Sequence, residues 1–247
     1  MKEDIIYGLN PAMEALRGTR KVFELFVAGT SADKRLEKLL KLAAEKGVPV
    51  RYREKTDISR LCGSDHHQGV ALRIEGFSYA EIDEIFERCS TSDGNGLIIV
   101  LDGIQDPHNL GAIIRSAACA GAHGVIIPKD RAAGVTPTVE KASAGAVETI
   151  PVVQVVNIAQ TLEELKKAGF WIYGASDNAS ALLYDQNLTG ATALVIGNEG
   201  EGIRPLVRKK CDEVFSIPML GGVSSLNASV AAGVALFEVV RQRMRKK

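Results

Sequence analysis

The five residues at positions 97–101, Leu-Ile-Ile-Val-Leu, include no polar side chain. A strand of this composition has no face suited to water, so it must be covered on both faces, as strands of a parallel sheet are. Strands that alternate with helices form right-handed βαβ crossovers. Helix-length segments separate further short apolar runs, which lie at 124–128, 151–156, 170–175, 193–197 and 213–218. Residues 97–247 are therefore predicted to form an α/β domain with a mostly parallel sheet.

The residues before this run predict a second, smaller α/β domain at 1–76. It combines short apolar strands with an amphipathic helix at 32–46, where leucines recur at helical spacing. Residues 77–96 separate the two domains. They are rich in acidic side chains and end in the loop sequence Thr-Ser-Asp-Gly-Asn-Gly. We expect a linker with a short acidic helix there.

Composition and spacing exclude several classes of protein. The chain has 30 Lys and Arg against 30 Asp and Glu, so its net charge neither favours nor excludes a nucleic-acid partner. It has no apolar run near 20 residues and no secretory signal, so we expect no membrane span and a cytoplasmic location. Its four cysteines form no Cys-x-x-Cys pair and its histidines lack metal-ligand spacing, so no metal site is expected.

Three polar, glycine-rich loops follow strands of the predicted sheet, at 102–111, 197–202 and 218–227. Ligands of parallel sheets bind at the carboxyl ends of the strands, so these loops predict a site. None of them carries a dinucleotide fingerprint, a Walker A sequence or a serine-hydrolase elbow. Their glycines expose backbone groups that suit a purine edge and a zwitterionic ligand. From the residues alone, the prediction is a ligand-binding α/β domain.

Each candidate side chain in these loops has a functional and a structural interpretation. Glu199 is either a functional carboxylate, acting as a general base or an orienting acceptor, or a solvated loop carboxylate. Arg115 is either a substrate contact or part of a surface ion pair. Ser225 and Asn227 either meet the ligand or cap the last helix, which is expected to start near Leu226. Asn109 is expected to cap the helix that follows the first loop.

Longer stretches around these loops resemble a known family. The segments LDGIQDPHNLGAIIRSAACAG (101–121), LVIGNEGEGI (194–203) and IPMLGGVSSLNASVAAGVALFE (217–238) are similar to the three motifs of the SpoU (TrmH-type) branch of the SPOUT methyltransferases. The segments YGLNPAMEAL (7–16) and HHQGVAL (66–72) resemble the L30e-like RNA-binding domain that precedes the catalytic domain in this family. EKASAGAVE (140–148) also matches a family segment, but no role is assigned to its Lys141 and Ser143.

The resemblance implies an α/β fold with a deep trefoil knot, S-adenosylmethionine (AdoMet) bound in the knot, and a homodimer. It implies methylation of a ribose 2′-hydroxyl, of a guanosine in large-subunit (23S) rRNA. The alternatives are a tRNA ribose methyltransferase, an antibiotic-resistance methyltransferase and a non-catalytic RNA-binding or ribosome-assembly protein. The residues implied as catalytic or RNA-facing are Asn109, Arg115, Glu199, Ser225 and Asn227. Those implied as cofactor-binding are Gly197, Ile217, Gly222, Ser225 and Leu226, with Ala175 and Ser176 nearby.

Two further expectations concern partners. Small residues of the last helix, Ala228, Ala231, Ala232 and Ala235, permit close approach of a second helix or packing on the domain's own sheet. Clusters of basic side chains are candidates for phosphate contacts or for solvated surface. These clusters are Lys34, Arg35, Lys38 and Lys41; Arg51, Arg53 and Lys55; and Arg241, Arg243, Arg245, Lys246 and Lys247.

Overall fold

The computed structural model describes residues 3–18, 20–29, 34–92, 94–198, 200–222 and 225–245. The chain forms two compact units, each with its own sheet and hydrophobic core. Unit 1 contains residues 1–78 and 135–149, and unit 2 contains residues 79–134 and 150–247. Sequence patterns group residues 135–149 with the C-terminal domain, whereas their contacts place them in unit 1.

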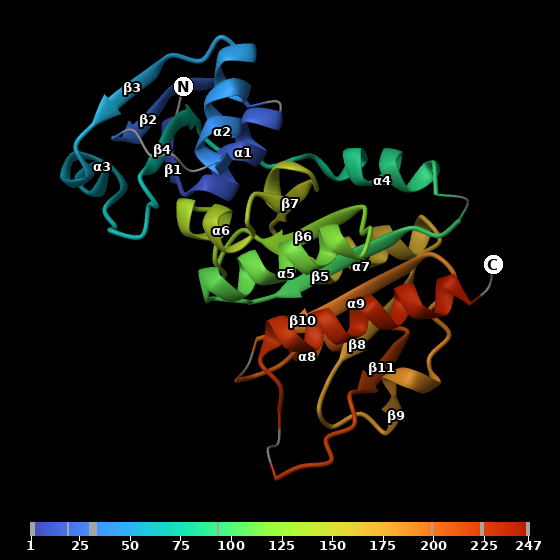
Figure 1. Cartoon of the computed structure of the whole chain (residues 1–247). Coiled ribbons are helices and arrows are strands. Elements are labelled where there is room, and N and C mark those ends of the chain that lie inside the picture. The colour runs from blue at the N-terminus through green and yellow to red at the C-terminus, as the bar shows by residue number, and fades with distance from the viewer. Residues whose placement is uncertain are drawn as a thin grey trace. The chain divides into compact units, whose positions relative to one another are not determined.

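Unit 1 contains a four-stranded sheet with the order β1-β4-β2-β3 (Figure 1). Only β2 and β3 run parallel, and β4 pairs antiparallel with both β1 and β2. Leu25, Leu39 and Leu72 are fully buried in its core. The elements are β1 (Glu3–Tyr7), α1 (Leu9–Arg17), β2 (Val22–Ala28), α2 (Lys34–Glu45), β3 (Val50–Arg53), α3 (Lys55–Cys62), β4 (Val70–Glu75), α6 (Pro137–Ala142) and the 3-10 helix η1 (Ala146–Glu148).

A buried ion-pair cluster holds α6 and η1 in unit 1. Arg20 donates to Glu140 at 2.9 Å and to Glu148 at 2.6 Å, and its guanidinium also bonds the carbonyl oxygen of Glu75. The side chains of the two carboxylates are 3% and 6% exposed. Burial raises the pKa of Glu140 to about 7, and attraction to Arg20 opposes that rise. Two carboxylates therefore share one guanidinium in a site that water barely reaches.

Unit 2 contains a parallel sheet of seven strands with the order β7-β6-β5-β10-β8-β11-β9. The prediction of a parallel α/β sheet is therefore confirmed. The strands are β5 (Leu97–Asp102), β6 (Gly124–Pro128), β7 (Val152–Val155), β8 (Trp171–Ala175), β9 (Ala181–Leu182), β10 (Thr192–Gly197) and β11 (Glu213–Ser216). The helices are α4 (Ile82–Ser90), α5 (Pro107–Cys119), α7 (Ile158–Lys167), η2 (Leu183–Asp185), α8 (Pro205–Arg208) and α9 (Ala228–Met244).

The apolar strand β5 lies at the centre of this unit, and all six of its residues are buried. Ile98 and Val100 belong to an apolar cluster with Ile85 of α4, Leu162 of α7 and Val207 of α8. α5 and α9 pack against each other (Figure 1), and α5 contacts β6 while α9 contacts β10. The expectation that β5 is shielded from water on both faces is confirmed. Within the described ranges, no helix has both the length and the apolar character that crossing a membrane requires.

Three alanines of the last helix are buried within unit 2. Ala228, Ala232 and Ala235 are at most 5% exposed, so these residues pack in unit 2 rather than presenting a face to a partner. Besides Arg241, the side chains that α9 leaves exposed are large and apolar. Spaced seven residues apart along one stripe of the helix, they are Val230 (49% exposed), Phe237 (51%) and Met244 (72%).

Candidate functional site

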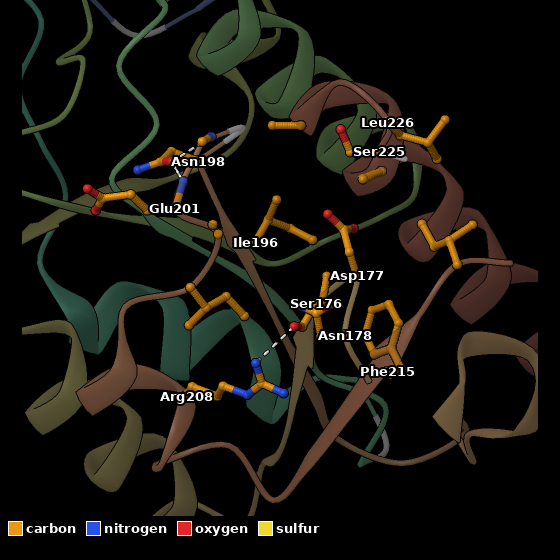
Figure 2. A pocket seen from close by; sticks show the side chains of 18 of the residues that line it. Ser176, Asp177, Asn178, Ile196, Asn198, Glu201, Arg208, Phe215, Ser225 and Leu226 are labelled. Atoms are coloured by element: carbon orange, nitrogen blue, oxygen red, sulfur yellow. Dashed lines mark hydrogen bonds between the residues drawn. The ribbon is translucent and has the colours of Figure 1, made fainter. Parts of the chain in front are cut away.

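The carboxyl ends of β8, β10 and β11 border a pocket of about 200 Å³ (Figure 2). These strands are parallel, so the loops that follow them leave the same edge of the sheet. The side chains of Ile196, Phe215 and Leu226 line the pocket beside the carboxylates of Asp177 and Glu201. The lining is mostly polar and includes these three apolar side chains, so the pocket can bind a small molecule that has both polar groups and an apolar part.

Most of the predicted cofactor-binding residues lie around this pocket. Those that line it are Gly197, Ile217, Ser225 and Leu226. Gly222 is exposed and is not part of the lining. Ala175 and Ser176 also line the pocket, and the Ser176 hydroxyl accepts a hydrogen bond from Arg208 Nη1 at 3.1 Å. Geometry therefore brings the predicted set together except for Gly222, while the cofactor roles themselves stay a prediction.

Gly197, the last residue of β10, is packed too tightly to carry a side chain. A Cβ atom at this position would lie 2.0 Å from the carbonyl carbon of Gly202. The chain returns to Gly197 through a turn in which Asn198 Oδ1 accepts from the N–H groups of Gly200 and Glu201, at 2.9 and 2.7 Å. The absence of a side chain at position 197 therefore lets this turn close against the strand and form the pocket wall.

A buried salt bridge joins the end of β5 to the loop after β10. Asp102 is 0% exposed, and its Oδ2 accepts from the backbone N–H of Arg204 at 2.8 Å. Its Oδ1 accepts from Arg204 Nε at 2.7 Å and lies 2.6 Å from Nη2. Sequence patterns assign no role to Asp102 and miss this pairing. A carboxylate that ends an otherwise apolar strand indicates that a partner is needed, but not which residue supplies it.

A side-chain hydrogen bond links α5 to the start of α9. Asn227 Nδ2 donates to Asn109 Oδ1 at 3.0 Å, and Asn109 is 9% exposed. Asn227 Oδ1 accepts from the N–H of Ser229 at 2.9 Å, so the interpretation of Asn227 as a helix cap is confirmed. Because one amide group forms both bonds, the first and third loops are held together by the cap of α9.

The prediction that Asn109 caps a helix is wrong. α5 begins at Pro107, and its cap is Asp106, whose Oδ1 accepts from the N–H of His108 at 2.9 Å. Proline at the first helical position loses no intrahelical hydrogen bond and has a suitable φ, so the helix starts earlier than expected. Asn109 consequently lies inside the first turn, where its side chain is available to Asn227.

Of the two charged residues predicted for the site, the structure describes Arg115 but not Glu199. Arg115 lies on the exposed face of α5, and its side chain forms no ion pair or hydrogen bond with any residue in the part of the chain described. The surface ion-pair interpretation of Arg115 is therefore not supported. Glu199, which was predicted as a base or an orienting group, lies outside the described residues, as do Val223 and Ser224.

Three cysteine thiols, those of Cys62, Cys89 and Cys211, are not activated for chemistry. Burial raises the pKa of Cys62 and of Cys89 to about 11, and that of Cys211 to about 12. Thiols with such values stay protonated near neutral pH and are poor nucleophiles. Among the residues whose positions are described, no three His, Cys, Asp or Glu side chains gather in a way that could hold a metal ion.

Several basic side chains that were candidates for RNA contacts are used within the chain. Arg243 donates to four backbone carbonyl oxygens in the loops that precede β5 and β10. Arg241 bonds both carboxylate oxygens of Glu238, at 2.6 and 2.7 Å. Arg51 pairs with Glu24 at 3.4 Å. Lys246 and Lys247 lie beyond the described residues.

Comparison with known proteins gives consistent matches for both units. Residues 96–237 match the SpoU rRNA Methylase family, and residues 5–80 match the family described as RNA 2′-O ribose methyltransferase substrate binding. The 23S rRNA (guanosine-2′-O-)-methyltransferase RlmB of Ralstonia nicotianae is 44% identical over 98% of this chain and 97% of its own length. RlmB of Pseudomonas putida is 43% identical over 98% of each chain. The structure of the SpoU methyltransferase AviRb from Streptomyces viridochromogenes in complex with AdoMet aligns with a TM-score of 0.81 at 29% identity, over 98% of this chain and 91% of that chain.

Proposed function

Since this chain belongs to the SpoU rRNA Methylase family, we propose that it methylates the 2′-hydroxyl of a guanosine ribose in 23S rRNA with AdoMet as methyl donor. The observation that carries the proposal is the pocket at the carboxyl edge of the unit 2 sheet. It is lined by residues of two loops whose sequences resemble the family motifs, at 197–202 and 218–227, in a chain that spans nearly the full length of relatives named for this reaction. The chain is accordingly an RNA methyltransferase.

The groups in the pocket fit AdoMet. Ile196 and Leu226 offer apolar surface to an adenine ring. The carboxylates of Asp177 and Glu201 can accept hydrogen bonds from ribose hydroxyls and from the ammonium of a methionine moiety. The proposed cofactor-binding residues are Gly197, Ile217, Gly222, Ser225 and Leu226, of which Gly222 lies outside the pocket lining.

The main task of the protein in this reaction is to align the 2′-oxygen of the ribose with the methyl group of AdoMet. AdoMet, when bound, supplies a methyl group that passes to the 2′-oxygen as its bond to sulfur breaks and the hydroxyl proton is lost. Holding the 2′-oxygen in line can contribute roughly 7–11 kcal/mol, and assistance with the proton about 10²–10⁴-fold in rate. No step of this displacement requires a metal ion.

We assign Arg115 to the RNA rather than to proton abstraction. A guanidinium stays protonated at any pH at which the protein works, so it is a poor base. With no intramolecular partner among the described residues, its planar fork is available to a phosphate or to the 2′-oxygen. Glu199 and Asn109 are proposed to orient Arg115 and the ribose, while Ser225 and Asn227 position the third loop.

The proposal extends to the state of the protein in the cell. The exposed stripe of Val230, Phe237 and Met244 on α9 supports a homodimer, because clustered exposed apolar side chains mark contact surfaces. A trefoil knot formed by the pocket loops and a cytoplasmic location, where 23S rRNA is available, belong to the same proposal.

The test supplies methyl-labelled AdoMet with unmodified 23S rRNA and, separately, with tRNA, followed by digestion to nucleosides. We expect labelled 2′-O-methylguanosine from the rRNA and none from the tRNA. Arg115→Ala should lose the product and keep AdoMet binding in calorimetry, whereas the exposed Lys46→Ala should keep both. Product from tRNA alone would move the substrate to tRNA. AdoMet binding with no product from either RNA or from ribosome-assembly particles would support the non-catalytic alternative.

A further inference from the structure

Three segments that resemble the family but carry no assigned chemistry come together in unit 1. The Oε1 atom of Gln68 accepts from the N–H of Leu9 at 3.1 Å, and Lys141 Nζ donates to the carbonyl oxygen of His66 at 2.9 Å. These contacts join stretches from distant parts of the sequence, at 7–16, 66–72 and 140–148. The segment 140–148, which includes Lys141, therefore packs against the other two segments within unit 1.

A cavity of about 640 Å³ opens where these segments meet. Its volume falls within the roughly 300–1,000 Å³ of typical ligand pockets. Its polar and charged lining consists of Lys55, Asp65, His66, Gln68 and Lys141. Because Lys55 begins α3 and Lys141 lies in α6, the two ammonium groups reach the cavity from different elements.

The loop that forms one wall of the cavity is fixed by a buried histidine. His67 Nδ1 accepts from the N–H of Gly69 at 3.0 Å, and Nε2 lies 3.1 Å from Ser59 Oγ. An imidazole that accepts at Nδ1 is neutral and donates from Nε2. Burial lowers the pKa of His67, the charges of Lys55 and Lys141 lower it further, and the carboxylate of Asp65 opposes them. The wall is therefore held by a neutral ring in a region of positive potential.

The groups that face this cavity are mostly hydrogen-bond donors. Lys141 Nζ lies 4.5 Å from the centroid of the Tyr7 ring, which holds the ammonium group in place beside its bond to His66. The amide nitrogen of Gln68 has no hydrogen-bond partner in the described part of the chain, since Leu9 occupies only its oxygen. Two cations, an amide donor and an exposed imidazole against a single carboxylate suit an anionic ligand with an aromatic part.

We propose that this cavity is a docking subsite for one nucleotide of the substrate RNA, with its phosphate bound by Lys55 and Lys141 and its base held against His66 and Gln68. The inference rests on the proposed function and adds to it a site in unit 1, apart from the residues assigned to methyl transfer in unit 2. It also gives Lys141 a role in RNA docking, although its sequence position falls within the residues matched to the methylase family.

The test measures RNA affinity at several salt concentrations for Lys55→Glu, Lys141→Gln and the matched control Lys46→Glu, which changes an exposed lysine outside the cavity. Lys55→Glu and Lys141→Gln should each weaken binding at least tenfold and reduce the slope of log K against log salt by about 0.7–0.9. Lys141→Arg, which keeps the positive charge, should keep the wild-type affinity and salt slope. A carboxylate in the first turn of α3 is favoured by the helix dipole, so Lys55→Glu should leave the fold intact, as circular dichroism would show.

His66→Ala separates a base contact from a phosphate contact. It should lower RNA affinity and leave the salt slope unchanged, because it removes a stacking surface for the base and none of the lysines that bind the phosphate. Affinities and slopes of the cavity variants that match those of Lys46→Glu would overturn the subsite, even if the wild type methylates rRNA. Failure of the wild type to bind AdoMet would instead overturn the proposed function, and calorimetry on the same samples distinguishes the two results.

Discussion

Replacing Asp102 should show how strongly one carboxylate fixes the wall of the proposed AdoMet pocket. It is fully buried at the end of β5 and holds Arg204, in the loop after β10, through both the backbone and the side chain. Asp102→Ala removes every one of these contacts, while Asp102→Asn keeps an oxygen for the backbone N–H. The two variants therefore separate the hydrogen-bond acceptor from the charge.

The loss of stability in Asp102→Ala can be divided between two contacts, the hydrogen bond from the Arg204 backbone and the ion pair with the Arg204 side chain. A hydrogen bond from a buried N–H to a charged acceptor contributes about 1.5–3 kcal/mol. The Arg204 side chain is 45% exposed, so solvent screens its pair with Asp102 and reduces that contribution to about 0–1 kcal/mol. We expect Asp102→Ala to lower the free energy of unfolding by about 2–4 kcal/mol, which corresponds to roughly 4–16 °C in Tm for a chain of this size. Asp102→Asn should cost about 1 kcal/mol.

Urea unfolding followed by tryptophan fluorescence measures this cost in the relevant unit. Trp171 is the only tryptophan of the chain and lies on β8, in the same sheet as β5. Asp106→Ala is the matched control, because it removes a carboxylate from the same loop that only caps α5, at a cost of about 1 kcal/mol. Asp102→Ala should also weaken AdoMet binding in calorimetry, since the loop that carries Glu201 loses its anchor.

Equal losses in Asp102→Ala and Asp106→Ala would refute this reasoning. So would a double-mutant cycle of Asp102→Asn with Arg204→Ala in which the two effects simply add, because residues in contact normally show a coupling energy of about 0.5–3 kcal/mol.

Three further predictions address other features. Gly197→Ala should abolish AdoMet binding and destabilise unit 2, because its Cβ atom would overlap the backbone of Gly202; Gly221→Ala, which has open space around it, should show neither effect in calorimetry and circular dichroism. Arg115→Lys should lower kcat at least tenfold with AdoMet affinity unchanged, and retention of most activity would contradict a bidentate contact. Folding raises the pKa of Glu140 to about 7 from an ordinary 4.5, so its contribution to stability is complete below about pH 4.5 and declines by up to about 3 kcal/mol as the pH rises through 7. Hydrogen exchange in α6 between pH 5 and 8 should show this decline in the wild type and lose it in Glu140→Gln.

Local patterns were sufficient for the sheet of unit 2 and for the position of the pocket. The apolar run of β5 required cover on both faces, and parallel strands place their following loops at one edge whatever their order in the sheet. The order β5-β10-β8-β11 brought the second and third loops to the same pocket, as the placement of Gly197, Ile217 and Leu226 shows.

Features that depend on distant partners were not predictable. Nothing near Asp102 indicates that Arg204 will neutralise it, and nothing near Arg243 indicates that four carbonyl oxygens will occupy a guanidinium expected to meet solvent or RNA. The error at Asn109 has a different origin. Two cap signals lie three residues apart, and Asp106 is favoured by the proline that follows it.

The Arg20 cluster has a consequence for the order in which the protein can fold during synthesis. Domains generally fold as units from the N-terminus as the chain emerges. All four strands of the unit 1 sheet are available once Glu75 has been made, yet Arg20 finds its two carboxylates 120 and 128 residues further along the chain. By then β5, α5 and β6 have already left the ribosome. A nascent chain of which residues 1–96 have emerged should therefore carry a loosely closed first sheet, and one of which residues 1–149 have emerged a protease-resistant one, although the second sheet has not yet been completed.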